Sequence, residues 1–121
     1  MSISKILVVD DSATDLAHIQ SIVTDQGYFV STATSGKEAI AKATDEKPDL
    51  IFLDVIMNEM DGFKTCRFLA TNEETKTIPV IFLTSKNQKA DKVWADMQGG
   101  KGFLTKPAEP ELVAEEIKRF I

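Results

Sequence analysis

Residues 50–54 read Leu-Ile-Phe-Leu-Asp, so four consecutive apolar side chains end at a single carboxylate. The same arrangement occurs at residues 6–11 (Ile-Leu-Val-Val-Asp-Asp) and at residues 80–84 (Val-Ile-Phe-Leu-Thr). Short, continuous apolar runs of this kind are typical of parallel strands that are buried on both faces of a sheet. Weaker strand patterns occur at residues 28–30 and 102–104. The sequence therefore predicts five strands.

Helical patterns separate these strands. Ser12 is followed three residues later by Asp15, and Ser35 by Glu38, and both pairs resemble the capping box that begins a helix. The expected helices cover about residues 12–26, 35–47, 61–70, 88–98 and 110–120. Alternating strands and helices indicate an α/β domain with a parallel sheet and right-handed crossovers.

A polar residue follows almost every strand of this predicted sheet. These residues are Asp10, Asp11, Asp54, Thr84 and Lys106. Because the carboxyl ends of parallel strands lie along one edge of an open sheet, we expect these side chains to converge there. The sequence predicts one acidic pocket that contains a single lysine.

This set of residue types indicates phosphoryl chemistry. Three carboxylates in one pocket repel one another unless a cation lies among them, and oxygen ligands without histidine or cysteine suit Mg²⁺. Lys106 supplies a compact positive charge and Thr84 a hydroxyl group. The chain has no glycine-rich P-loop pattern for a tightly bound nucleotide. The combination is consistent with phosphoryl transfer onto Asp54 itself.

The composition is that of one globular domain. The 121 residues are 43% hydrophobic and 27% charged, and we expect a single domain over residues 1–121 with no output domain. A net charge of -5 argues against nucleic-acid binding. The single cysteine, Cys66, excludes an internal disulfide and suits a packing role. Neither a signal peptide nor an apolar run of membrane-spanning length is present, which favours a cytoplasmic protein without membrane contact.

Four segments together resemble the receiver domain of two-component response regulators. They are Asp10-Asp11-Ser12, residues 54–62 (Asp-Val-Ile-Met-Asn-Glu-Met-Asp-Gly), Thr84-Ser85 and Lys106-Pro107. The resemblance covers the whole chain. It implies a flavodoxin-like, doubly wound, five-stranded parallel sheet of order 2-1-3-4-5, with five helices on both faces. It also implies a protein that catalyses only its own phosphorylation and dephosphorylation, and is not a conventional turnover enzyme.

The resemblance implies a role for each pocket residue. Asp54 is the expected phosphoacceptor for a phosphoryl group from a histidine kinase. Asp11 and Asp54 are expected ligands of Mg²⁺, and Asp10 binds the metal through water or supports it. The backbone carbonyl of Ile56 is a further expected ligand. Lys106 bridges Asp54 and the phosphoryl group.

The resemblance also implies a switch. Thr84 moves its hydroxyl group onto the phosphoryl group, and the Phe103 ring then turns inward. Lys106 and Pro107 are joined by a cis peptide bond. The altered surface consists of the fourth helix, the fifth strand and the fifth helix. Asn58 departs from the family pattern, which has proline there, and makes the loop geometry and the metal affinity less certain.

A narrower similarity is carried by four segments: Thr84-Ser85-Lys86, Lys92-Val93-Trp94, Gln98-Gly99 and residues 103–107. These segments look like the stand-alone receivers of chemosensory systems that control type IV pili and twitching or phototactic motility. The similarity implies a chemotaxis-type histidine kinase as phosphodonor, a pilus or motility protein as downstream partner, and a monomer. A flagellar chemotaxis receiver and a phosphate sink are the alternatives within the family. Trp94 suits either a partner surface or the core.

Three other functions fit parts of the sequence. A phosphatase of the haloacid-dehalogenase kind would need a second acid two residues after Asp54, where Ile56 stands. A flavin carrier on the same topology would need a phosphate loop after the first strand, where Asp10 and Asp11 would repel the flavin phosphate. A module that binds partners without phosphorylation would not need the complete pocket.

Overall fold

The computed structural model describes residues 3–55, 57, 60–85 and 92–121, without the side chains of Lys92 and Trp94. Five strands alternate with five helices in this part of the chain. The elements are β1 (Lys5–Val9), α1 (Ala13–Asp25), β2 (Phe29–Ala33), α2 (Gly36–Glu46), β3 (Leu50–Asp54), α3 (Gly62–Thr71), β4 (Val80–Ser85), α4 (Lys92–Met97), β5 (Gly102–Lys106) and α5 (Pro110–Lys118). The predicted strands and helices are thus confirmed, and the start expected for the fourth helix at residue 88 lies outside the described residues.

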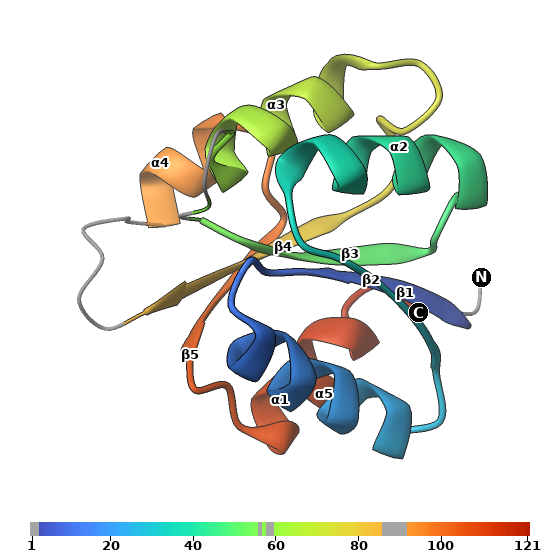
Figure 1. Ribbon diagram of the computed structural model, residues 1–121, viewed down its shortest axis with the longest axis vertical. Helices are drawn as coiled ribbons and strands as arrows, with labels where there is room; N and C mark the ends of the chain where they lie inside the picture. Colours follow the sequence, from blue (N-terminus) through green and yellow to red (C-terminus); the bar gives the residue numbers. More distant parts are fainter. Residues whose placement is uncertain (1–2, 56, 58–59, 86–91) are drawn as a thin grey trace.

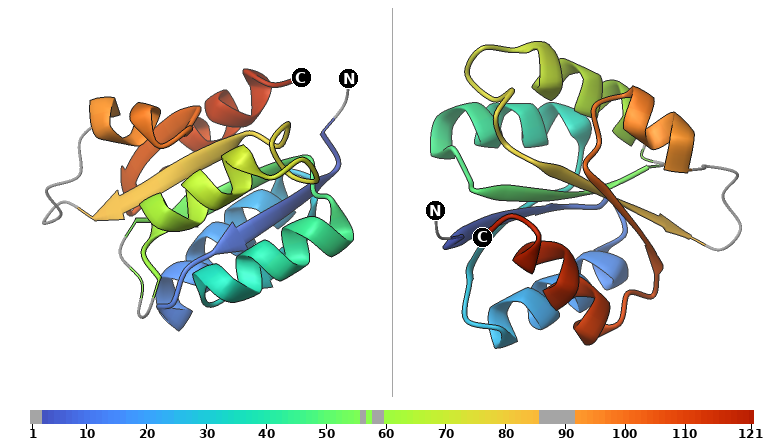
Figure 2. Two further views of the ribbon diagram at one scale, coloured as in Figure 1. Left: turned by 90° about the horizontal axis from the view of Figure 1, so that it is seen from above. Right: turned by 180° about the vertical axis from the view of Figure 1, so that it is seen from behind.

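All the strands pair in parallel, in the order β2-β1-β3-β4-β5. Helices α1 and α5 cover one face of the sheet, whereas α2, α3 and α4 lie on the other (Figure 1). The view from above in Figure 2 shows the helices running alongside the strands. The predicted flavodoxin-like topology is therefore confirmed.

The central strands are buried on both faces because helices cover both. Along β1, Ile6 and Val8 pack into the core beneath α1 and α5, whereas Leu7 and Val9 pack into the core beneath α2 and α3. Alternate side chains of a strand point to opposite faces, so a run without polar residues fills both cores. Cys66 is fully buried in the second of these cores, and burial raises its pKa to about 12, as suits a packing residue.

Helices α1 and α2 both begin at a serine cap. The Ser12 hydroxyl accepts a hydrogen bond from the Asp15 N–H, and the Ser35 hydroxyl accepts one from the Glu38 N–H. The α1 cap places the start of that helix directly after Asp10 and Asp11. Among the described residues, no helix has the length and apolar character needed to cross a membrane.

Candidate functional site

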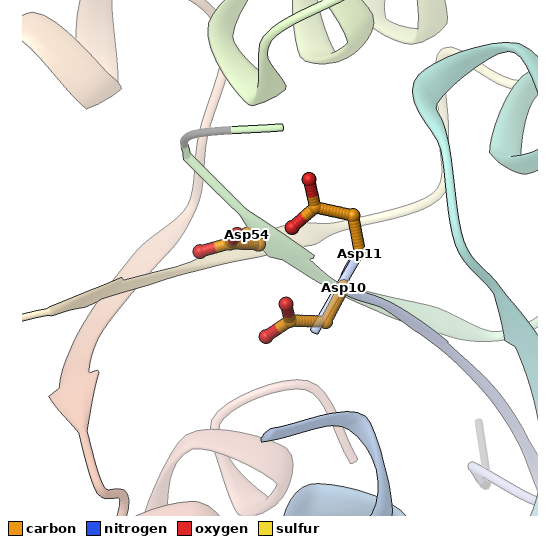
Figure 3. A group of neighbouring side chains, drawn as sticks. All are labelled: Asp10, Asp11 and Asp54. Atoms are coloured by element: carbon orange, nitrogen blue, oxygen red, sulfur yellow. The ribbon is translucent and has the colours of Figure 1, made fainter. Parts of the chain in front are cut away.

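Three carboxylates meet at the carboxyl edge of the sheet. Asp54 is the last residue of β3, and Asp10 and Asp11 directly follow β1, the strand that pairs with β3. One oxygen of each carboxylate lies within 4.8 Å of the others (Figure 3). Asp10 and Asp54 are buried, with 0% and 2% of their surface exposed, and Asp11 is exposed. The predicted convergence of these residues is confirmed.

Asp54 carries a buried charge that its neighbours only partly compensate. In the described part of the chain, its Oδ1 atom accepts no well-directed hydrogen bond. Burial and the negative charge of Asp10 raise the pKa of Asp54 to about 6, against the opposing effect of Lys106. A buried carboxylate whose charge is only partly compensated is stabilised by a bound cation or by a covalent change that redistributes its charge.

Lys106 is the last residue of β5 and directs its ammonium group into this cluster. Its Nζ atom donates to Oδ2 of Asp10 at 2.9 Å and forms an ion pair with Oδ1 of Asp54 at 3.1 Å. Burial alone would lower the pKa of Lys106, but the adjacent carboxylates raise it above its ordinary value. The peptide bond to Pro107 is cis, as the resemblance implied.

A fourth carboxylate contacts the same ammonium group. Oδ2 of Asp15, in the first turn of α1, accepts a hydrogen bond from Lys106 Nζ at 2.9 Å. The sequence pattern predicted only a helix-capping role for Asp15, outside the pocket. A Ser-x-x-acid pattern indicates a helix start whether or not the acid has a distant partner, so local sequence carried no signal for this contact.

Gly62 places the start of α3 against the end of β3. Its N–H donates to the Val55 carbonyl at 2.6 Å. A Cβ atom at this position would come within 2.0 Å of the Asp54 carbonyl oxygen. Only a residue without a side chain fits this close approach, which holds the backbone of the phosphoacceptor candidate in place.

Thr84 lies on β4, the strand that pairs with β3, and Phe103 lies on β5, the next strand outward. Leu83 pairs with Asp54, so Thr84 is one residue beyond that pair on β4, where it is 4% exposed. Its hydroxyl lies 3.4 Å from the Ser85 carbonyl. Phe103, on the edge strand β5, is partly buried against the core beneath α2 and α3.

Three predicted positions cannot be placed in this site. Ile56 and Asn58 lie outside the described residues, and so does the side chain of Trp94. The expected carbonyl ligand and the effect of the missing proline therefore stay predictions.

The donor atoms of the cluster suit Mg²⁺. All three side chains offer carboxylate oxygens, the ligands that Mg²⁺ prefers, and two of the three are buried. Oδ1 of Asp54 accepts no well-directed hydrogen bond in the described structure and has Lys106 Nζ beside it at 3.1 Å, so the carboxylate keeps lone pairs that a metal could use. An acidic cluster with this composition is typical of the Mg²⁺ site of receiver domains, the family that the sequence resembles.

Residues 6–118 match the family model of the response regulator receiver domain. The chain belongs to this family. It is 39% identical to the protein PilH of Pseudomonas aeruginosa over 114 residues, which are 94% of each chain. It is 36% identical to PilG of the same organism, over 97% of this chain and 87% of PilG. The crystal structure of the chemotaxis response regulator CheY4 of Vibrio cholerae superposes with a TM-score of 0.87 at 32% identity, covering 99% of this chain and all of that one.

Membership of the receiver family explains why the pocket has this form. A receiver domain accepts a phosphoryl group from a histidine kinase and passes on a signal in a phosphorelay, and it is not a conventional turnover enzyme. The acidic pocket of Asp10, Asp11 and Asp54 is the part of this chain that corresponds to that role. The phosphatase and flavin-carrier alternatives find no support in this match.

Proposed function

We propose that this receiver accepts a phosphoryl group on Asp54 from the phosphohistidine of a histidine kinase. The observation that carries the proposal is the buried Asp54 carboxylate, whose Oδ1 accepts no well-directed hydrogen bond in the described structure, beside Lys106. A carboxylate oxygen attacks phosphorus, the new P–O bond forms as the P–N bond breaks, and the departing imidazole takes up a proton. Hydrolysis of the acyl phosphate returns the protein to its resting form.

Asp10, Asp11 and Asp54 would hold Mg²⁺ in this reaction, with the Ile56 carbonyl as a further ligand. When bound, Mg²⁺ supplies positive charge that offsets the carboxylates and the phosphoryl oxygens. Lys106 lies between Asp10 and Asp54 and orients the charge of the incoming group. In our proposal, the Thr84 hydroxyl contacts the phosphoryl group once it is in place.

The signal would leave the domain through α4, β5 and α5. Movement of Thr84 changes the space at the end of β4, and the Phe103 ring on the neighbouring strand then turns inward. Two side chains of α4, Val93 and Met97, are each 69% exposed. Apolar groups at this exposure support a role for α4 in contacting a partner protein.

The downstream partner would be a protein of pilus-based motility. The similarity to PilH and PilG over almost the whole chain supports this assignment. A chemotaxis-type histidine kinase would then be the phosphodonor, and the receiver would act in the cytoplasm as a monomer. The alternatives are a flagellar-type chemotaxis receiver and a phosphate sink, and the structural likeness to CheY4 is compatible with the first.

Acetyl phosphate and BeF₃⁻, a phosphoryl analogue, test the phosphoacceptor. With Mg²⁺ present, acetyl phosphate should add one phosphoryl group, as measured by intact-protein mass spectrometry, and BeF₃⁻ should shift the amide resonances of β4 and β5. Asp54→Ala should abolish both responses. The matched control is Asp49→Ala at the opposite end of β3, which should retain both. An Asp54→Ala variant that still responds would contradict the proposal.

A second experiment identifies the signalling role. Phosphotransfer from candidate kinases identifies the phosphodonor, and the decay rate of the acyl phosphate on Asp54 is measured alongside it. A pull-down then separates a regulator from a phosphate sink, because a sink needs no downstream partner. A pull-down with the BeF₃⁻-bound form should retain a motility protein that the unmodified form releases. Equal retention by Asp54→Ala would instead indicate a module that binds without phosphorylation.

A further inference from the structure

Two helices of this receiver begin with the same Ser-x-x-acid pattern but use the acid differently. In α2, Oε1 of Glu38 accepts the Thr34 N–H at 2.7 Å, so the carboxylate serves the helix start. In α1, the Ser12 N–H donates to Oδ1 of Asp10 at 2.9 Å. This N–H is the group that the acid of a capping box would accept. The Ser12 N–H therefore donates to Asp10 and is not available to the Asp15 carboxylate.

The Asp15 carboxylate instead forms the third contact of the Lys106 ammonium group. An ammonium group has three N–H donors. One donates to Asp10 and one to Asp15, each at 2.9 Å, and Asp54 lies 3.1 Å away in an ion pair. Because the ammonium group is tetrahedral, fixing two of its N–H bonds also fixes the direction of the third. That third N–H bond is the one left to interact with Asp54.

The exposed fractions of the three side chains show which contact of Lys106 lies on the solvent side. The side chain of Asp10 is fully buried and that of Lys106 is 11% exposed, whereas that of Asp15 is 44% exposed. Asp15 thus stands between the ammonium group and the solvent. Without it, a water molecule would replace a charged acceptor, and the flexible lysine side chain would have one fixed hydrogen bond fewer.

We infer that Asp15 is a positioning residue that holds the Lys106 ammonium group in the orientation needed to bind a phosphoryl group on Asp54. The inference rests on the proposed phosphoryl transfer to Asp54. Asp15 acts through Lys106 and is not one of the clustered carboxylates that suit the metal. It should therefore affect the phosphoryl group more than Mg²⁺.

The test compares Asp15→Ala with Glu38→Ala, the matched change at the start of α2, and with the conservative Asp15→Glu. BeF₃⁻ affinity is measured by ¹⁹F NMR in saturating Mg²⁺, and Mg²⁺ affinity by calorimetry. Asp15→Ala should weaken BeF₃⁻ binding about fivefold, the value of one charge-assisted hydrogen bond near the surface, and leave Mg²⁺ affinity within about twofold. Asp15→Glu should restore most of the loss, and Glu38→Ala should change neither affinity.

A metal-free measurement gives a second readout. The ¹⁵Nζ resonance of Lys106 should be visible in the wild-type protein and in Glu38→Ala, and should broaden through faster exchange with water in Asp15→Ala. Wild-type BeF₃⁻ affinity in Asp15→Ala, or an equal loss in Glu38→Ala, would overturn the positioning role while leaving the phosphoacceptor intact. A wild-type protein that binds no BeF₃⁻ would overturn both proposals.

Discussion

The two ends of β3 carry the same residue type in opposite environments. Asp49, directly before the strand, accepts hydrogen bonds from the Ser4 N–H at 2.9 Å and the Lys5 N–H at 3.0 Å. These backbone hydrogen bonds lower its pKa. Asp54, the last residue of the strand, has an oxygen without a well-directed hydrogen bond in the described structure, and its pKa is raised to about 6.

The difference shows how one strand separates stability from function. The hydrogen bonds of Asp49 join the start of β3 to the start of β1 and stabilise the ionised carboxylate. The backbone of Asp54 is held by the close approach of Gly62, whereas Oδ1 of its carboxylate accepts no well-directed hydrogen bond in the described structure. A reactive carboxylate needs this second environment, because each hydrogen bond to its charged form would make it a weaker nucleophile.

The largest change in stability should come from Gly62→Ala. The added methyl group must displace the backbone around Asp54, so we expect the free energy of unfolding to fall by about 2–3 kcal/mol in urea denaturation. Mg²⁺ affinity should fall as well, because the Asp54 backbone moves. A stable variant with normal Mg²⁺ affinity would show that this end of β3 is not rigidly held.

Asp49→Ala should destabilise the fold without affecting the pocket. Loss of its hydrogen bonds should lower the free energy of unfolding by about 1–2 kcal/mol, a value limited by the access of water to the Ser4 and Lys5 N–H groups. Calorimetry should give an unchanged Mg²⁺ affinity. A lower affinity would mean that the two ends of the strand are coupled.

Asp54→Asn should raise the free energy of unfolding, whereas the two preceding substitutions lower it. In metal-free buffer at neutral pH, the amide removes a buried charge beside Asp10, while Lys106 keeps its hydrogen bonds to Asp10 and Asp15. We expect a gain of about 1 kcal/mol in the free energy of unfolding. Thermal unfolding in EDTA measures the effect, and a loss of stability would show that the ion pair with Lys106 outweighs the repulsion.

The smallest effects should appear as opposite pH dependences. The pKa of Asp49 is lowered by folding, so its contribution to stability is present above the ordinary value of 3.8 and is lost as pH falls through the folded pKa. The pKa of Asp54 is raised, so stability in metal-free protein should decrease as pH rises from about 4 to about 6. Unfolding of wild type, Asp49→Asn and Asp54→Asn, measured from below pH 3.8 up to about pH 6, should separate the two, because the Asp49 effect lies below 3.8 and the Asp54 effect lies above it. Equal pH dependence of all three proteins would remove the contrast.

The strands were predictable because their pattern is local and one-dimensional. The apolar runs at 6–9, 50–53 and 80–83 each became a buried parallel strand. The convergence of Asp10 and Asp54 then followed from topology, since parallel strands place their carboxyl ends together. Asp15 and Gly62 were missed for the opposite reason. Their roles depend on contacts with Lys106 and with the Asp54 carbonyl, which no local pattern encodes.

The sequence by itself determined the alternation of strands and helices, the single acidic pocket and the residue types that suit Mg²⁺ and a phosphoryl group. These features follow from side-chain chemistry and strand order. Only the tertiary structure decided which aspartate carboxylates accept a full set of hydrogen bonds and which do not. Asp49 and Asp54 are chemically identical, and the environment that folding builds around each carboxylate makes one a structural anchor and the other the candidate phosphoacceptor.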